Sequence, residues 1–116
     1  MDAGDSGEGS LMVTPFGVEI SGAPTAPVVV VTGEIDVATS PQLRTELNSL
    51  VERGARDITL EFGGVSFVDS SGLGVLVGTY KRLRDQGSGS IRIVGAQASV
   101  RKVFEITGLE DALLVD

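Results

Sequence analysis

The sequence predicts a single α/β domain: a mostly parallel sheet of four to five strands, with an antiparallel edge strand and three helices. Two patterns in its 116 residues carry this prediction. Short runs rich in Val and Ile alternate with amphipathic stretches of about ten to fifteen residues, as in βαβ units. Residues that start and stop helices flank those stretches. A chain of this length is enough for one core.

The strands are expected at apolar runs bounded by turn residues. Residues 12–20 form a first strand, which Pro15 and Gly17 confine to an edge. A short loop over residues 21–27 then predicts antiparallel pairing with the next strand. The remaining strands are expected at residues 28–32, at 57–62 with a break at Gly63 and Gly64 and an extension at 65–68, at 90–94 and at 113–115.

Three helices are expected where apolar residues recur at intervals of three and four. The first begins at Thr39 or Ser40, with Pro41 in its first turn, and Gly54 ends it. The second opens at residues 69–72 and ends at Gly87, and the third covers residues 98–107 and ends at Gly108. The second helix carries an apolar stripe of Leu73, Leu76, Val77, Tyr80 and Leu83.

Gly74 and Gly78 lie one turn apart on one face of the second expected helix. Inside a helix each glycine costs about 1 kcal/mol relative to Ala. Close approach of the helix to the sheet, or to a partner, would offset that cost. We expect close packing within the fold, with a partner surface as the alternative.

The composition excludes several classes of function. Nine basic and sixteen acidic residues give a net charge of −7, which argues against binding nucleic acid or an anionic membrane. The chain has no Cys and no His, so disulfides, thiol nucleophiles and a Ser-His-Asp triad are absent. The glycines at 72, 74 and 78 miss the G-x-G-x-x-G spacing of a dinucleotide site, and neither a P-loop nor a G-x-S-x-G motif occurs.

The N-terminal segment, residues 1–10, contains three acids, three glycines and two serines. We expect it to be disordered, with the folded domain spanning residues 11–116. No segment approaches the roughly 20 apolar residues that cross a bilayer. A cytoplasmic protein without cofactors is therefore expected.

Loops at the carboxyl ends of parallel strands share one edge of a sheet, where ligands tend to bind. This places Asp36, Ser70 and Gln97 on one rim. We expect Ser70 to cap the second helix, where a phosphate would meet free backbone N–H groups and the positive end of the helix dipole. Phosphorylation would add about −1.5 to −2 charges. The alternative is that Ser70 only caps the helix.

Three carboxylates are expected near this rim. Glu34 and Asp36 share one loop, and Asp69 precedes the helix. Together they could bind a divalent cation weakly. We favour the alternative, in which Asp69 helps to cap the helix, the other two are solvated and no metal is bound.

Three motifs then resemble one known family. Residues 65–76 (VSFVDSSGLGVL) resemble the signature of STAS domains, specifically of the anti-sigma factor antagonists. Residues 32–38 (TGEIDVA) are similar to the family's loop after its second strand, and residues 104–109 (FEITGL) to its closing helix and turn. The resemblance covers residues 12–116 and implies the STAS fold.

The resemblance also implies a function, that of a non-enzymatic regulator of transcription. The unphosphorylated protein would bind an ATP-bound anti-sigma factor that is also a serine kinase, and so release the sigma factor. Phosphorylation of Ser70 would abolish this binding, and a serine phosphatase would reverse it. The partner-binding residues expected on this basis and from the rim are Asp36, Thr39, Asp69, Ser70, Ser71, Gly72, Leu73 and Gln97.

Two other interpretations stay open. The chain could be a STAS subunit of a larger signalling or transport-associated assembly that does not switch. It could also be an enzyme or nucleotide-binding protein that uses the rim between Asp36 and Asp69.

Overall fold

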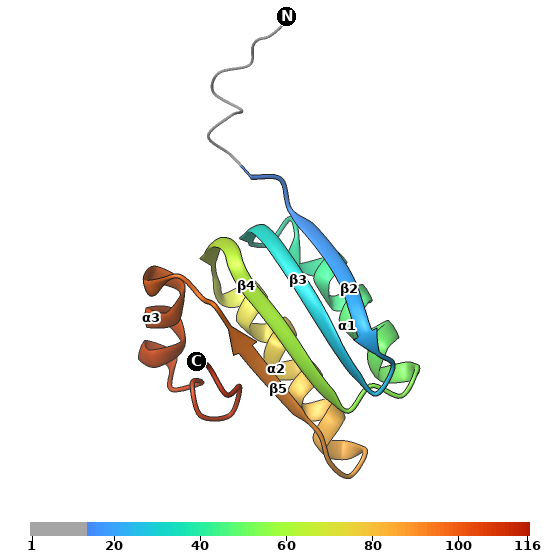
Figure 1. Cartoon of the computed structure of the whole chain (residues 1–116). Coiled ribbons are helices and arrows are strands. Elements are labelled where there is room, and N and C mark those ends of the chain that lie inside the picture. The colour runs from blue at the N-terminus through green and yellow to red at the C-terminus, as the bar shows by residue number, and fades with distance from the viewer. Residues whose placement is uncertain (1–13) are drawn as a thin grey trace, which may run out of the picture.

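A computed structural model describes residues 14–116, which contain a four-stranded sheet in the order β2-β3-β4-β5 (Figure 1). Strand β2 is antiparallel to β3, and β3, β4 and β5 are parallel. This arrangement confirms the predicted α/β class, its antiparallel edge strand and its three helices. The elements are β2 (Gly17–Ala23), β3 (Ala26–Ile35), α1 (Ser40–Glu52), β4 (Asp57–Val68), α2 (Ser70–Asp85), β5 (Ser90–Val94) and α3 (Ala98–Thr107).

The first two strands form a tight hairpin, so the loop predicted over residues 21–27 is wrong. Ala23 pairs with Ala26, which leaves only two residues in the turn. Gly22 adopts a φ of 87°, which glycine accommodates without strain, and Pro24 lies in the turn itself. Gly22 and Pro24, which indicated a loop, therefore form part of the tight hairpin. The expected last strand is reduced to one bridge between Ile93 and Val115.

Strand β4 also runs on where a break was predicted. Its pairing with β3 shifts register twice, after Val30 and after Gly33, so Gly63 and Gly64 form part of a bulged but continuous strand. A Cβ on Gly64 would lie 2.9 Å from Thr32 Cγ2, so only glycine fits there without movement. The extension carries β4 to Val68, opposite the end of β3.

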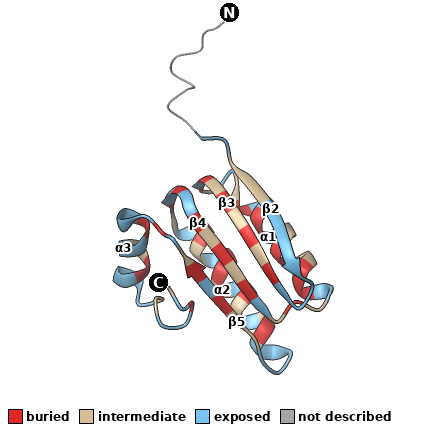
Figure 2. Cartoon of the chain, in the orientation of Figure 1, coloured by how far each residue is buried: buried red, intermediate tan, exposed pale blue. Residues whose placement is uncertain are grey.

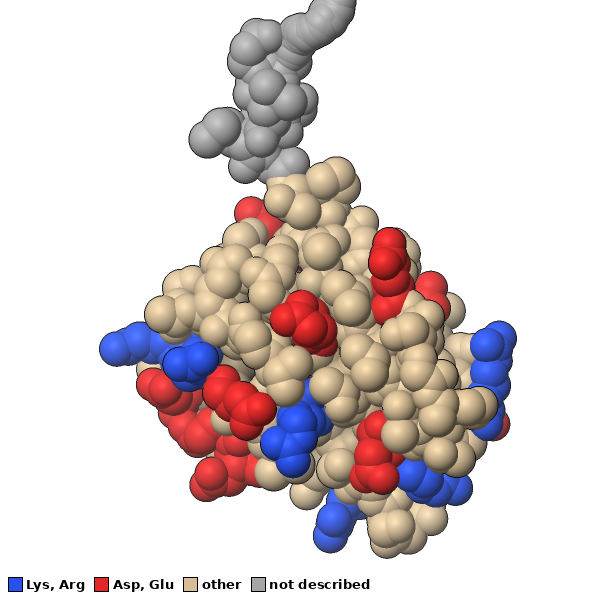
Figure 3. Space-filling view, viewed as in Figure 1, with Lys and Arg blue, Asp and Glu red and all other residues tan. Residues whose placement is uncertain are grey.

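Helices α1 and α2 pack side by side on one face of the sheet (Figure 1). In β3, in β5 and in the first half of β4, buried residues alternate with half-buried or exposed ones, so the core lies between this face and the helices (Figure 2). Among residues 14–116 no helix covers the opposite face, which carries separate acidic and basic side chains among uncharged residues (Figure 3). The core includes Val29, Val31, Leu43, Leu47, Leu60, Leu76 and Ile93.

Helix α3 packs at the edge of this core. Val100 and Phe104 are buried, and the Phe104 ring lies 6.5 Å from that of Phe62 on β4. The helix ends at Gly108, whose φ of 73° is left-handed, as predicted for a glycine cap. Within residues 14–116, no helix is both long and apolar enough to cross a membrane.

Replacing Phe104 with Ala tests this packing. The ring is fully buried, so Phe104→Ala should lower the free energy of unfolding by about 3–5 kcal/mol. Ile106→Ala is the matched control on the same helix, because Ile106 is 75% exposed; its effect should stay within about 0.5 kcal/mol. Urea denaturation measures both, and equal losses would contradict the burial of Phe104.

Candidate functional site

The candidate site is the rim where β3 and β4 end side by side. Ile35 pairs with Val68, and the backbone N–H of Asp69 donates to the carbonyl of Ile35 over 3.1 Å. The loop after β3 and the start of α2 are thus joined directly. The structure therefore brings the segment of Asp36 together with that of Ser70.

Gly72 allows α2 to begin against the sheet. A Cβ at this position would lie 2.6 Å from Ile35 Cγ2 and 3.2 Å from Val68 Cγ1. Any side chain larger than hydrogen would push the first turn of the helix away from the ends of β3 and β4. Gly72 is therefore a positioning residue for the rim. Leu73, the next residue, packs partly buried against the core.

The cap of α2 is Asp69, so the prediction that Ser70 caps the helix is wrong. One carboxylate oxygen of Asp69 accepts hydrogen bonds from the backbone N–H groups of Ser71, at 2.9 Å, and Gly72, at 3.3 Å. The Ser71 hydroxyl donates to the same oxygen. Asp69 precedes the helix in an extended conformation, which is the geometry of an N-cap.

The two serines of the motif therefore differ. The Ser71 hydroxyl is bound to Asp69 and the residue is half-buried. Ser70 is exposed, and its hydroxyl forms no hydrogen bond with any other described residue. Of the two, Ser70 is therefore the more exposed residue and the one whose hydroxyl is not already bound.

The loop after β3 is held by its own polar groups. Asp36 Oδ1 accepts from the N–H groups of Ala38, at 2.9 Å, and Thr39, at 3.1 Å. Thr39 Oγ1 accepts from the Asp36 N–H at 2.9 Å and donates to the carbonyl of Glu34 at 2.7 Å. Asp36 and Thr39 thus shape the loop that leads into α1.

Two exposed apolar residues on this rim were missed by the sequence analysis. Val37 is 77% exposed at the tip of the loop, and Phe67 is 46% exposed near the end of β4. Phe67 pairs with the exposed residue Glu34. Val37 could have been identified from the sequence, because it is an apolar residue inside an otherwise polar loop. Phe67 faces outward because the register shifts in β4 change which residues reach the core.

Gln97 has a different environment. Its Nε2 donates to the carbonyl of Gly63 at 3.2 Å, which ties the start of α3 to the bulged part of β4. No hydrogen bond among residues 14–116 links Gln97 to the Asp36 loop or to Ser70. Glu34, Asp36 and Asp69 do not converge, and the described part of the chain contains no acidic cluster suited to a metal ion.

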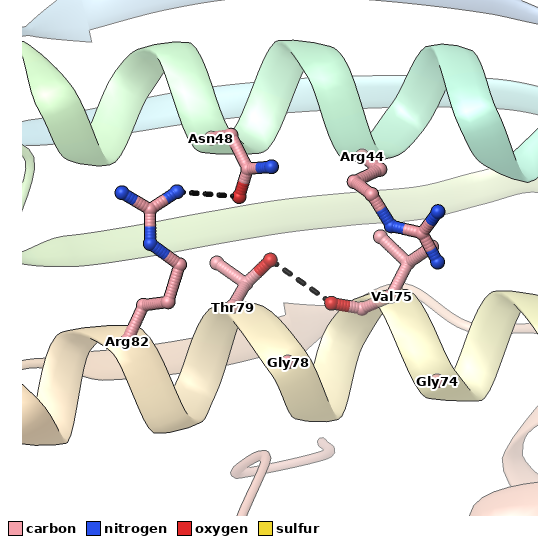
Figure 4. A pocket seen from close by; sticks show the side chains of 7 residues that line it. All are labelled: Arg44, Asn48, Gly74, Val75, Gly78, Thr79 and Arg82. Carbon is pink, nitrogen blue, oxygen red and sulfur yellow. Dashed lines mark hydrogen bonds between the residues drawn. The ribbon is translucent and has the colours of Figure 1, made fainter.

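Gly74 and Gly78 do not pack against the fold, so that prediction is wrong. Both are exposed, and a Cβ on either would meet nothing within 4 Å. They line a groove of about 300 Å³ between α1 and α2 (Figure 4). The roughly 1 kcal/mol that each glycine costs a helix is thus not offset by contacts within the described fold.

The cap determines the charge state of Asp69. The hydrogen bond from the Ser71 hydroxyl lowers the pKa of Asp69 most, burial partly opposes it, and the backbone N–H groups of Gly72 and Ser71 lower it further. A carboxylate with a lower pKa in the folded state stabilises the fold at pH values above its unfolded pKa of about 3.9. This stabilisation is lost as the pH falls through the folded pKa.

Asp69→Asn tests the charged cap. Asparagine can still accept the N–H bonds but carries no charge. At pH 7 the parent protein should melt at a higher temperature than the variant, and the difference should shrink as the pH falls below about 3.9. Calorimetry from pH 7 to pH 3 measures it, with Asp111→Asn, an exposed aspartate outside the cap, as the control. A difference that does not change with pH would contradict this role.

Comparison with known proteins relates this geometry to a family. Residues 18–115 match the STAS domain. The anti-sigma-B factor antagonist of Bacillus subtilis is 44% identical over 83 residues, which cover 72% of this chain and 74% of that protein. The anti-sigma factor antagonist SpoIIAA in its unphosphorylated form aligns with a TM-score of 0.73 at 26% identity, over 88% of each chain.

The phosphorylated form of the Bacillus cell fate determinant SpoIIAA aligns with a TM-score of 0.66 at 26% identity, over 88% of this chain and 91% of that one. Fold, sequence and motifs therefore agree. The chain belongs to the STAS domain family and, within it, to the anti-sigma factor antagonists.

Proposed function

We propose that this chain is an anti-sigma factor antagonist whose binding to an anti-sigma factor is switched by phosphorylation of Ser70. The observation that carries the proposal is the exposed Ser70 hydroxyl, which no other described residue binds, beside a Ser71 hydroxyl that Asp69 already holds. The names of the relatives support an anti-sigma factor as the partner. One relative has been described in both unphosphorylated and phosphorylated forms.

The chemistry of the switch needs only an acceptor from this chain. The anti-sigma factor, acting as a serine kinase, would hold ATP and supply the base. Ser70 Oγ attacks the γ-phosphorus, the new Oγ–P bond replaces the bond from that phosphorus to ADP, and the hydroxyl proton passes to the kinase. A serine phosphatase reverses the change by hydrolysis. The chain itself, with no His and no Cys, acts in binding and not in catalysis.

The rim suits binding when Ser70 is unmodified. The apolar side chains of Val37 and Phe67 offer contact area, and Glu34 is exposed beside them. The hydrogen bonds of Asp36 and Thr39 fix the loop before any partner arrives, which lowers the entropy lost on binding. The proposed surface thus favours a partner with apolar and basic groups.

Phosphorylation of Ser70 would make this surface unfavourable for binding the partner. A phosphate brings about −1.5 to −2 charges. The N–H groups of Ser71 and Gly72, which would otherwise neutralise it, already bind Asp69, so the phosphate adds to the charge of that carboxylate. Burial of this unmatched charge under a partner is unfavourable, and the complex dissociates.

The first experiment is a paired pull-down from a lysate of the source organism, with Ser70→Ala and Ser70→Glu as baits. The Ala protein should retain an ATP-binding anti-sigma factor that the Glu protein loses, and mass spectrometry identifies it. Ser71→Ala is the matched control and should still lose the partner on phosphorylation. If both baits retain the same large assembly, the chain is a subunit that does not switch.

Direct phosphorylation tests the choice of serine. With the purified anti-sigma factor and ATP, the parent protein and Ser71→Ala should each gain one phosphate, and Ser70→Ala should gain none. The reason is that, of the two adjacent serines, only Ser70 has a hydroxyl that no other described residue binds. Intact-mass measurement reads this directly. A phosphate that remains on Ser70→Ala and disappears from Ser71→Ala would refute the assignment.

A further inference from the structure

We propose that the groove between α1 and α2 extends the partner-binding surface and receives an acidic segment of the anti-sigma factor. This inference rests on the proposed function, because its occupant belongs to the partner that binds at Ser70. The groove has a volume of about 300 Å³ and opens on the outer side of the two helices (Figure 4). It is lined by Arg44, Asn48, Gly74, Val75, Gly78, Thr79 and Arg82.

The charge of the groove differs from that of the chain. Although the net charge is −7, two of the nine basic residues point into this one groove, one towards each end (Figure 4). Arg82 donates to Asn48 Oδ1 at 2.7 Å, which fixes its guanidinium across the groove, and lies 3.9 Å from Glu52. Arg44 forms no ion pair with any of residues 14–116. A carboxylate from outside would complete its interactions.

The floor of the groove continues from Ser70. Ser70, Gly74 and Gly78 follow each other at steps of four residues along α2, so they lie on neighbouring parts of one helix face. Without side chains at 74 and 78, a partner backbone can approach α2 closely. The two glycines weaken the helix, and no contact inside the described fold offsets that cost. A partner that approaches closely at this point would explain why glycine stands at both positions.

Charge distinguishes between the possible occupants. A second copy that docked groove to groove about a two-fold axis would bring its own Arg44 and Arg82 into the same space, which is unfavourable. An acidic segment from the partner meets the two arginines instead. Residues 1–13 of this chain contain Asp2, Asp5 and Glu8 and are the remaining competitor, which the experiment separates.

The test uses the purified anti-sigma factor that the Ser70→Ala protein retains, titrated by calorimetry with variants made in that Ser70→Ala background. Gly78→Ala should raise the melting temperature by about 2–6 °C, since Ala favours a helix and meets nothing within 4 Å. The same change should weaken binding at least about tenfold, because the added methyl group blocks the close approach. Higher stability with lower affinity cannot come from a damaged fold.

Charge is tested with a matched pair. Arg44→Gln should weaken binding about tenfold and reduce its dependence on salt, because an ion pair with the partner is lost. Arg84→Gln removes the same charge from a residue of α2 outside the groove and should leave the affinity unchanged. The melting temperature of each variant confirms that its fold is intact.

Each result has a defined meaning. If Gly78→Ala and Arg44→Gln bind as tightly as their parent while Ser70→Glu does not bind, the groove is not part of the interface and the switch stands. Residues 1–13 are also removed from the parent and from both variants. If this removal restores parental affinity to neither Gly78→Ala nor Arg44→Gln, the partner is the occupant. If it tightens binding of the parent tenfold or more, the chain's own N-terminal segment occupies the groove and the proposal is wrong. If the Ser70→Ala protein retains no anti-sigma factor, the proposed function itself fails.

Discussion

The close approach of α2 to the paired ends of β3 and β4 is the constraint on which the rim depends. It requires Gly72, because a Cβ there would lie 2.6 Å from Ile35 Cγ2. It also requires the bulged extension of β4, which brings Val68 level with Ile35. Once these contacts form, the hydrogen bond from Asp69 to Ile35 fixes the start of α2 beside the Asp36 loop. The position of Ser70 is thus a result of packing.

Hydrogen bonds then decide which groups at this rim remain available. Asp36, Thr39 and Asp69 use their oxygens to build the loop and the cap, so their main effect is to reduce the freedom of the surface. The groups left exposed include the Ser70 hydroxyl and the side chains of Glu34, Val37 and Phe67. A surface prepared in this way loses little conformational entropy when a partner binds.

The sequence predicted the elements well where periodicity and end signals agreed. The limits of β5 and α3 were correct, because turn glycines flank a short apolar run and an amphipathic one. The sequence predicts a break at Gly63 and Gly64, because local composition does not reveal that pairing with β3 continues through a bulge. The outward side of Phe67 follows from the same bulge.

The orientation of α2 was the other part that local patterns could not supply. The predicted stripe included Leu73, Val77 and Tyr80, which are only half-buried, whereas Val75 and Thr79 are buried. In this rotation the bare face of Gly72 lies against Ile35, where a Cβ would not fit, and these two residues are far apart in the sequence. The same rotation turns Gly74 and Gly78 to the outside.

The occupied cap explains why a phosphate on Ser70 would be an effective signal. At an open helix N-terminus the backbone N–H groups would surround a phosphate and neutralise much of its charge. Here Asp69 already holds the N–H groups of Ser71 and Gly72, and the Ser71 hydroxyl keeps its pKa low, so the carboxylate stays charged near neutral pH. The charge of a phosphate on Ser70 would therefore stay directed outward, towards a partner bound at this rim. The feature that stabilises the helix is thus also the one that makes its first residue a sensitive place for a charge.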